Sequence, residues 1–98
     1  MIEELRARFM QRFLDSARER LVRARAAIAR DDARAIWNEM HALAGEAAII
    51  GLRSVSAAAR ANDALARQWM ESGIPAAAAD TALRTIEEEL AGAAGAAQ

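Results

Sequence analysis

The chain has 98 residues without an internal repeat or a break in composition, which fits one compact domain over residues 1–98. Its formal net charge is −1, all 13 basic residues are arginine, and it has no cysteine. These values argue against a nucleic-acid partner and exclude a disulfide framework or a thiolate metal site.

Hydrophobic residues make up 54% of the chain, but alanine supplies much of this fraction and only 4% of residues are aromatic. We therefore predict a thin, all-α core. No uncharged apolar run approaches the roughly 18 to 20 residues that span a bilayer. The N-terminal sequence Met1-Ile2-Glu3-Glu4 lacks the basic-then-apolar order of a signal peptide. We expect a cytoplasmic protein without a membrane partner.

The first predicted helix covers residues 1–30 and has one apolar face. Its apolar positions recur every three or four residues: Ile2, Leu5, Phe9, Phe13, Ala17, Leu21, Ala24 and Ile28. From Ile2 to Ala29 this helix would be about 42 Å long at 1.5 Å per residue. The sequence Ser16-Ala17-Arg18-Glu19 resembles an internal capping box. We expect a helix that is either long or kinked, and a kink or break would fall near Asp15.

The second predicted helix covers residues 33–50, and Asp31-Asp32 offers it an N-cap. Its apolar stripe consists of Ile36, Met40, Leu43, Ala47 and Ile50. His41, the only histidine, lies one residue away from this stripe, which corresponds to a rotation of about 100°. We therefore expect its ring at the edge of the core, where its tip can reach water.

The third predicted helix covers residues 54–71, with Ser54 as its cap, and the fourth covers residues 75–91, opened by Pro75. The inward residues of the third helix are Val55, Ala58, Leu65 and Trp69. Residues 92–98 are expected to fray. Four amphipathic segments with short connections predict an antiparallel up-down four-helix bundle.

Small residues follow His41 along the second helix: Ala44, Gly45 and Ala48. A glycine inside a helix costs about 0.5 to 1 kcal/mol relative to alanine, so Gly45 suggests a need for access to the ring. A structural histidine is the simpler interpretation of His41 alone. Metal binding is disfavoured because no clustered ligands accompany it, and Trp37 and Trp69 are expected in the core or at a bundle end.

The motif His41-x-Leu43-x-Gly45, followed by Ile50-Gly51, resembles the signature of histidine-containing phosphotransfer (HPt) domains. The resemblance extends over nearly the whole chain, since the segment 13–21 is similar to the helix that leads into this motif.

In that family, an aspartate-rich turn precedes the histidine helix, as Asp31-Asp32 does here, and the next helix supplies a polar or acidic residue near the imidazole. Counting without gaps, this residue is Asp63.

The resemblance implies a phosphocarrier rather than an enzyme. His41 would accept and donate a phosphoryl group, and its partners would be response-regulator receiver domains, with a hybrid sensor histidine kinase as a further candidate. Neutral imidazole is a nucleophile near pH 7, and Asp63 would hold its second nitrogen. No magnesium site or phosphate loop is recognisable in the sequence, so Mg²⁺ would come through the receiver, and we expect no cofactor of the chain's own.

The sequence departs from the family pattern at Ala44, where lysine is expected to meet the phosphoryl oxygens. The chain has no lysine, and Arg60 on the third helix is the first candidate to replace it. Two alternatives therefore remain open. One is a degenerate HPt-like docking or inhibitory module that binds a receiver or kinase without carrying phosphate, and the other is a plain helical interaction module.

Overall fold

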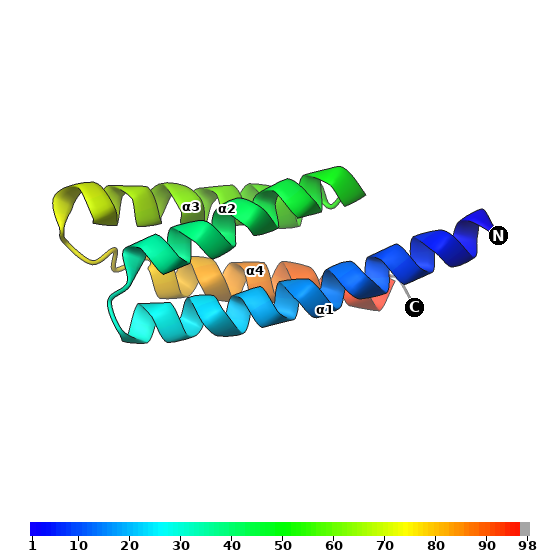
Figure 1. The fold of residues 1–98 in the computed structure, drawn as a ribbon, viewed down its shortest axis with the longest axis horizontal. Coiled ribbons are helices and arrows are strands. Elements are labelled where there is room, and N and C mark those ends of the chain that lie inside the picture. Colours follow the sequence, from blue (N-terminus) through cyan, green and yellow to red (C-terminus); the bar gives the residue numbers. More distant parts are fainter. Residues whose placement is uncertain (97–98) are drawn as a thin grey trace.

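The computed structural model describes residues 1–96, which form four helices and no strand. The helices are α1 (Ile2–Ala29), α2 (Ala33–Ile50), α3 (Arg53–Ser72) and α4 (Ala79–Ala96). Successive helices run in opposite directions (Figure 1). The predicted all-α, up-down four-helix bundle is therefore confirmed. Within the described part of the chain, no helix is long and apolar enough to cross a membrane.

The four helices form a square in which each packs on two neighbours. Both α1 and α3 contact α2 and α4, whereas residues 1–96 show no packing between α1 and α3 or between α2 and α4. The helix that carries His41 is therefore held between α1 on one side and α3 on the other.

The core is thin because much of it consists of alanine, whose small side chain allows close approach of the helices. Its larger buried side chains come from all four helices: Phe13, Leu14, Leu21, Ile36, Met40, Leu43, Val55, Trp69, Leu83, Ile86 and Leu90. Asn62, which interrupts the apolar series of α3, is fully buried, whereas Leu65 is only partly buried. In this part of α3, the line of buried residues is therefore displaced by one residue from the predicted one.

The first helix is long, as one of the two expectations had it, because it continues from Ile2 to Ala29 without interruption. The break expected near Asp15 is wrong. Leu14 and Ala17 are buried on either side of the expected break, so packing against the bundle keeps this segment helical. Asp15 lies on the exposed side, where its carboxylate pairs with Arg18. The start of α1 projects beyond the other helices (Figure 1), and residues 2–12 include no buried side chain.

Both ends of α2 are capped. Asp32 accepts a hydrogen bond from the backbone N–H of Ala35 through its Oδ1 (3.0 Å), as an N-cap carboxylate does. At the other end, Gly51 adopts a left-handed conformation with φ of 86°. The N–H of Leu52 then reaches the carbonyl of Ala47 (2.9 Å), which is the Schellman arrangement that glycine favours. These caps fix the length of the histidine-bearing helix.

Three predictions about the other helix ends are wrong. Ser54 does not cap α3, which begins at Arg53 with Leu52 as its N-cap and no side-chain hydrogen bond. Pro75 does not open α4, because a turn over residues 77–78 precedes the first helical residue, Ala79. The predicted frayed tail is helical as far as Ala96, where alanine's high helix propensity supports the last turns. Residues 97 and 98 of that tail lie outside the described residues.

Candidate functional site

His41 lies near the middle of α2 and faces α3, with 65% of its side chain exposed. Its Nδ1 lies 3.4 Å from Oδ2 of Asp63 on α3. Within residues 1–96, Nε2 has no hydrogen-bond partner. The two ring nitrogens therefore have different surroundings: one faces a carboxylate, and the other is free to meet a second molecule.

Asp63 is well placed to orient the imidazole, because only 15% of its side chain is exposed and it comes from a separate helix. If its carboxylate accepts the Nδ1 proton, the lone pair lies on Nε2. The separation exceeds the usual range of about 2.7 to 3.2 Å. Contacts of this kind commonly tighten when charge develops on the ring during reaction. The arrangement thus suits a histidine that acts as a nucleophile through Nε2.

Trp37 covers one face of the imidazole. It lies one turn before His41 on α2, and the two rings are stacked with centroids 5.1 Å apart and planes inclined by 27°. Trp37 was expected in the core or at a bundle end, and it is partly buried against the core. Its stack on His41 was not predicted, although the four-residue spacing is the signal for it. The indole therefore covers one face of the imidazole and leaves the other face open.

The exposed small residues next to His41 are Gly45 and Ala48. A Cβ atom added to Gly45 would meet nothing within 4 Å, so internal packing does not require glycine there. Ala44, the remaining small residue that follows His41, does not belong to this surface. Ala44 is 4% exposed, and its carbonyl accepts a hydrogen bond from the Ser56 hydroxyl (3.0 Å). A rotation of about 300° from His41 turns Ala44 towards the interface with α3.

Arg60 is exposed on α3, one turn before Asp63. Among the described residues it forms no ion pair or side-chain hydrogen bond, and none with His41 in particular. Its role as a substitute for the missing lysine stays a prediction.

The opposite side of α2 is tied to α1 by ion pairs. Glu39 accepts hydrogen bonds from Arg23 (2.8 Å) and from Arg20 (3.0 Å), and Arg20 also reaches Glu46 (2.7 Å). The hydrogen bond from Arg23, followed by that from Arg20, holds the pKa of the Glu39 carboxyl below its ordinary value of 4.5, although partial burial acts in the other direction. These contacts fix the back of the helix that presents His41.

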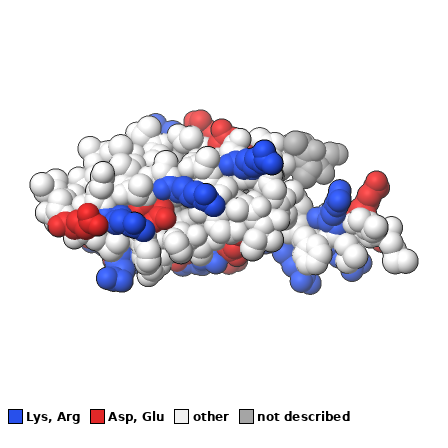
Figure 2. Space-filling view, turned by 90° about the horizontal axis from the view of Figure 1, so that it is seen from above, with Lys and Arg blue, Asp and Glu red and all other residues white. Residues whose placement is uncertain are grey.

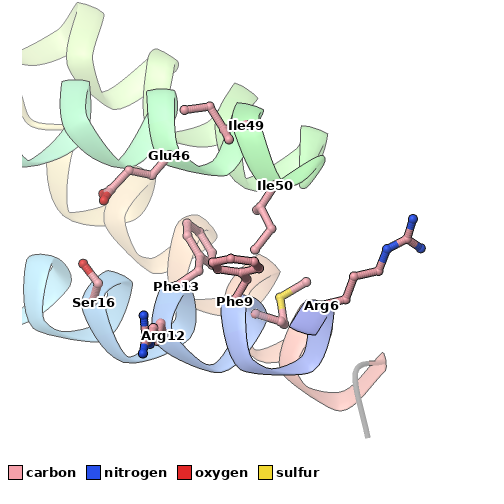
Figure 3. Close-up of a pocket in the computed structure, with 9 residues that line it drawn as sticks. Arg6, Phe9, Arg12, Phe13, Ser16, Glu46, Ile49 and Ile50 are labelled. Carbon is pink, nitrogen blue, oxygen red and sulfur yellow. The ribbon is translucent and has the colours of Figure 1, made fainter. Parts of the chain in front are cut away.

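A groove of about 800 Å³ lies away from His41. It separates the start of α1 from the end of α2, where Phe9 and Phe13 face Ile50 (Figure 3). None of the predicted site residues lines it. A search of residues 1–96 for three or more grouped histidine, aspartate, glutamate or cysteine side chains found no candidate metal centre.

Comparison with protein families matches the Hpt domain over residues 8–96. Because this match covers most of the chain, the protein belongs to the Hpt domain family, whose members are helical bundles that act as phosphocarrier modules in two-component signalling. The family thereby links the chain to phosphotransfer-related signalling and to response-regulator receivers. Searches of curated proteins and of solved structures each returned no match.

Proposed function

We propose that this protein is a cytoplasmic phosphocarrier, in which His41 accepts a phosphoryl group from the aspartate of one receiver domain and donates it to another. The observation that carries this proposal is the contact between Nδ1 of an exposed His41 and the mostly buried Asp63 carboxylate. A structural histidine has no need of an open Nε2.

The chemistry is a reversible transfer between nitrogen and oxygen. The Nε2 lone pair attacks the phosphorus of the aspartyl phosphate, the N–P bond forms, and the P–O bond breaks with its electrons going to the receiver's carboxylate. The Nδ1 proton stays on the ring, facing Asp63, and the carboxylate offsets the positive charge that the ring gains. The receiver supplies Mg²⁺ and the groups that stabilise the phosphoryl oxygens.

The surface around His41 supports close approach of such a partner. Gly45 and Ala48 project little beyond the helix backbone on the exposed side of α2. In-line transfer requires the reacting atoms to come within about 3 to 3.5 Å, and larger side chains here would hold the two domains apart.

A second candidate function is a docking or inhibitory module that binds a receiver or a hybrid sensor histidine kinase without carrying phosphate. The observation in its favour is that Ala44 stands in place of lysine and is buried, while Arg60 makes no contact with the imidazole among the described residues. A phosphohistidine here would lack that charged hydrogen bond, and such bonds contribute about 1.5 to 3 kcal/mol.

The two functions are separated by incubating the protein with phosphorylated receiver domains and a magnesium salt. The carrier function predicts acid-labile, alkali-stable phosphate on the wild-type protein and none on His41→Gln. Asp63→Asn serves as a matched variant that keeps the size of the side chain, and it should be phosphorylated more slowly. Binding of a receiver without labelling by any of them would establish the docking function instead.

A further inference from the structure

The arginines of α3 differ from several arginines of α1 and α4 in their ion pairing. Arg53, Arg60 and Arg67 are all exposed, and none forms an ion pair within residues 1–96. By contrast, the arginines in the second half of α1 and on α4 are all paired with carboxylates: Arg18, Arg20, Arg23, Arg25 and Arg84. Internal ion pairing therefore does not account for the three guanidinium groups of α3, which we call the arginine row.

The arginine row lies along one side of α3. Its members are seven residues apart, so each lies two turns from the next, and the row is about 21 Å long at 1.5 Å per residue. Asp63 comes three residues after Arg60 and four before Arg67, which places it on the same side of the helix. Since Asp63 contacts His41, the imidazole lies beside the middle of the row.

The helices α2 and α3 together carry four arginines and four carboxylates. Two of these carboxylates pair with α1, so the outward side that the two helices form is richer in arginine. Figure 2, which looks down on this side, shows basic side chains in a line, with acidic side chains at one end of the line and between two of its members. Arg34 adds an exposed cation two turns before His41 on α2. The carboxylates of Glu39 and Glu46 are instead turned towards α1, where they pair with Arg20.

We propose that the arginine row is a docking surface for the acidic transfer face of a receiver domain. This inference rests on the proposed function and names the part of the partner that meets α3. A receiver must hold Mg²⁺ beside its phosphorylated aspartate, and Mg²⁺ is bound by carboxylates. The face that approaches His41 is therefore negatively charged, and the row offers the complementary charge beside the reacting nitrogen.

The dimensions and charges fit this partner. One side of a typical protein interface covers about 800 Å², a patch about 28 Å wide, so a row of about 21 Å lies within a single footprint. A nucleic acid fits less well, because Asp63 lies between Arg60 and Arg67, Glu71 follows one turn after the row, and the chain carries a net charge of −1. The row acts at long range by steering the encounter, which distinguishes it from a single arginine that bonds the phosphoryl group.

The test measures association rates by stopped flow, in a His41→Gln background that prevents transfer. The probes are isolated receiver domains held in the activated state with beryllofluoride and Mg²⁺. Replacing the row by Arg53→Glu, Arg60→Glu and Arg67→Glu should slow association at least about tenfold at low salt, since steering raises such rates by about 10 to 10³. It should also flatten the dependence of the rate on ionic strength.

The matched control is Arg6→Glu, Arg8→Glu and Arg12→Glu, which changes the net charge equally on exposed arginines of α1, the helix diagonally opposite α3. Its association rate should stay within about threefold of the parent, because the basic face beside His41 is intact. If the glutamate variant of the row does not fold, as judged by circular dichroism, the corresponding glutamine variant replaces it and should show a smaller change in the same direction.

Equal rates for the row variant and the control would overturn the inference, as would the absence of binding to every receiver. Binding is also compared at 0.15 M salt, where the Debye length is about 8 Å. Tighter binding to a single-stranded oligonucleotide than to any receiver would overturn the inference as well. Charge-dependent binding without labelling of His41 would refute the carrier function and leave the docking surface standing. Labelling of His41 without charge-dependent binding would refute the docking surface and leave the carrier function standing.

Discussion

Gly45→Ala should make the protein more stable and a poorer phosphocarrier. Gly45 lies inside α2, five residues before its end, and is exposed. A Cβ atom there would meet nothing within 4 Å, so the substitution causes no overpacking. The free energy of unfolding should rise by about 0.5 to 1 kcal/mol from helix propensity alone. For a domain of this size, the melting temperature should rise by about 2 to 8 °C.

The same methyl group lies one turn after His41, on the surface that a receiver would approach under the proposed function. A displacement of about 1 Å between reacting groups can reduce a rate about 10²-fold, so we expect transfer to His41 to slow at least tenfold. The assay is single-turnover transfer from a phosphorylated receiver, together with thermal unfolding followed by circular dichroism.

Gly92→Ala is the matched control, because Gly92 is exposed within α4 and its added Cβ would also meet nothing within 4 Å. Since α4 lies diagonally opposite α2, this variant should gain similar stability and transfer phosphate at the wild-type rate. If Gly45→Ala also transfers at the wild-type rate, the steric role assigned to Gly45 is wrong.

Three further predictions concern an ion pair between helices, the packing of α1 and the stack on His41. Glu39→Gln should be less stable than wild type at neutral pH, because the lowered pKa of Glu39 stabilises the fold only while its carboxylate is charged. The free energies of unfolding of the two proteins should therefore converge as the pH falls below 4.5. Urea unfolding between about pH 7 and pH 3 measures this, and a constant difference in stability would contradict it. Phe13→Ala should lose about 3 to 5 kcal/mol of stability, because Phe13 is only 9% exposed. Phe9 is 59% exposed, so Phe9→Ala should change the stability by less than about 1 kcal/mol. Equal losses for the two variants would show that the start of α1 is packed. Trp37→Ala should slow phosphoryl transfer and broaden the distribution of His41 side-chain rotamers in NMR spectra. Trp37→Phe keeps a ring stacked on the imidazole, so it should restore the transfer rate and the rotamer distribution. If the phenylalanine variant behaves like the alanine variant, the stack does not have this role.

The fold could be predicted from the sequence because its helices follow an unbroken apolar period. The N-cap at Asp32 and the left-handed Gly51 are local signals, and both bound α2 as expected. Asp63 was found by counting residues from His41 in the family pattern, and the structure places its carboxylate against the ring. Helix periodicity, capping signals and the spacing between His41 and Asp63 were therefore sufficient to predict these features.

Other features depend on how the helices are rotated against one another, which a single sequence does not specify. Ala44 and Gly45 are adjacent in sequence, yet one is buried against α3 and the other is exposed. The capping pattern at Ser16 did not end α1, because packing of the helix on both sides overrode it. Pro75 marks a turn rather than a helix start, and the stack of Trp37 on His41 depends on side-chain rotamers.

The central claim is that His41 carries phosphate on the nitrogen that faces away from Asp63. The most direct measurement is the ³¹P–¹⁵N coupling in the NMR spectrum of the ¹⁵N-labelled protein after phosphorylation by a receiver. Since Nδ1 faces the Asp63 carboxylate, the coupling should assign the phosphoryl group to Nε2 of His41. Phosphate on Nδ1, or on another residue, would contradict the account.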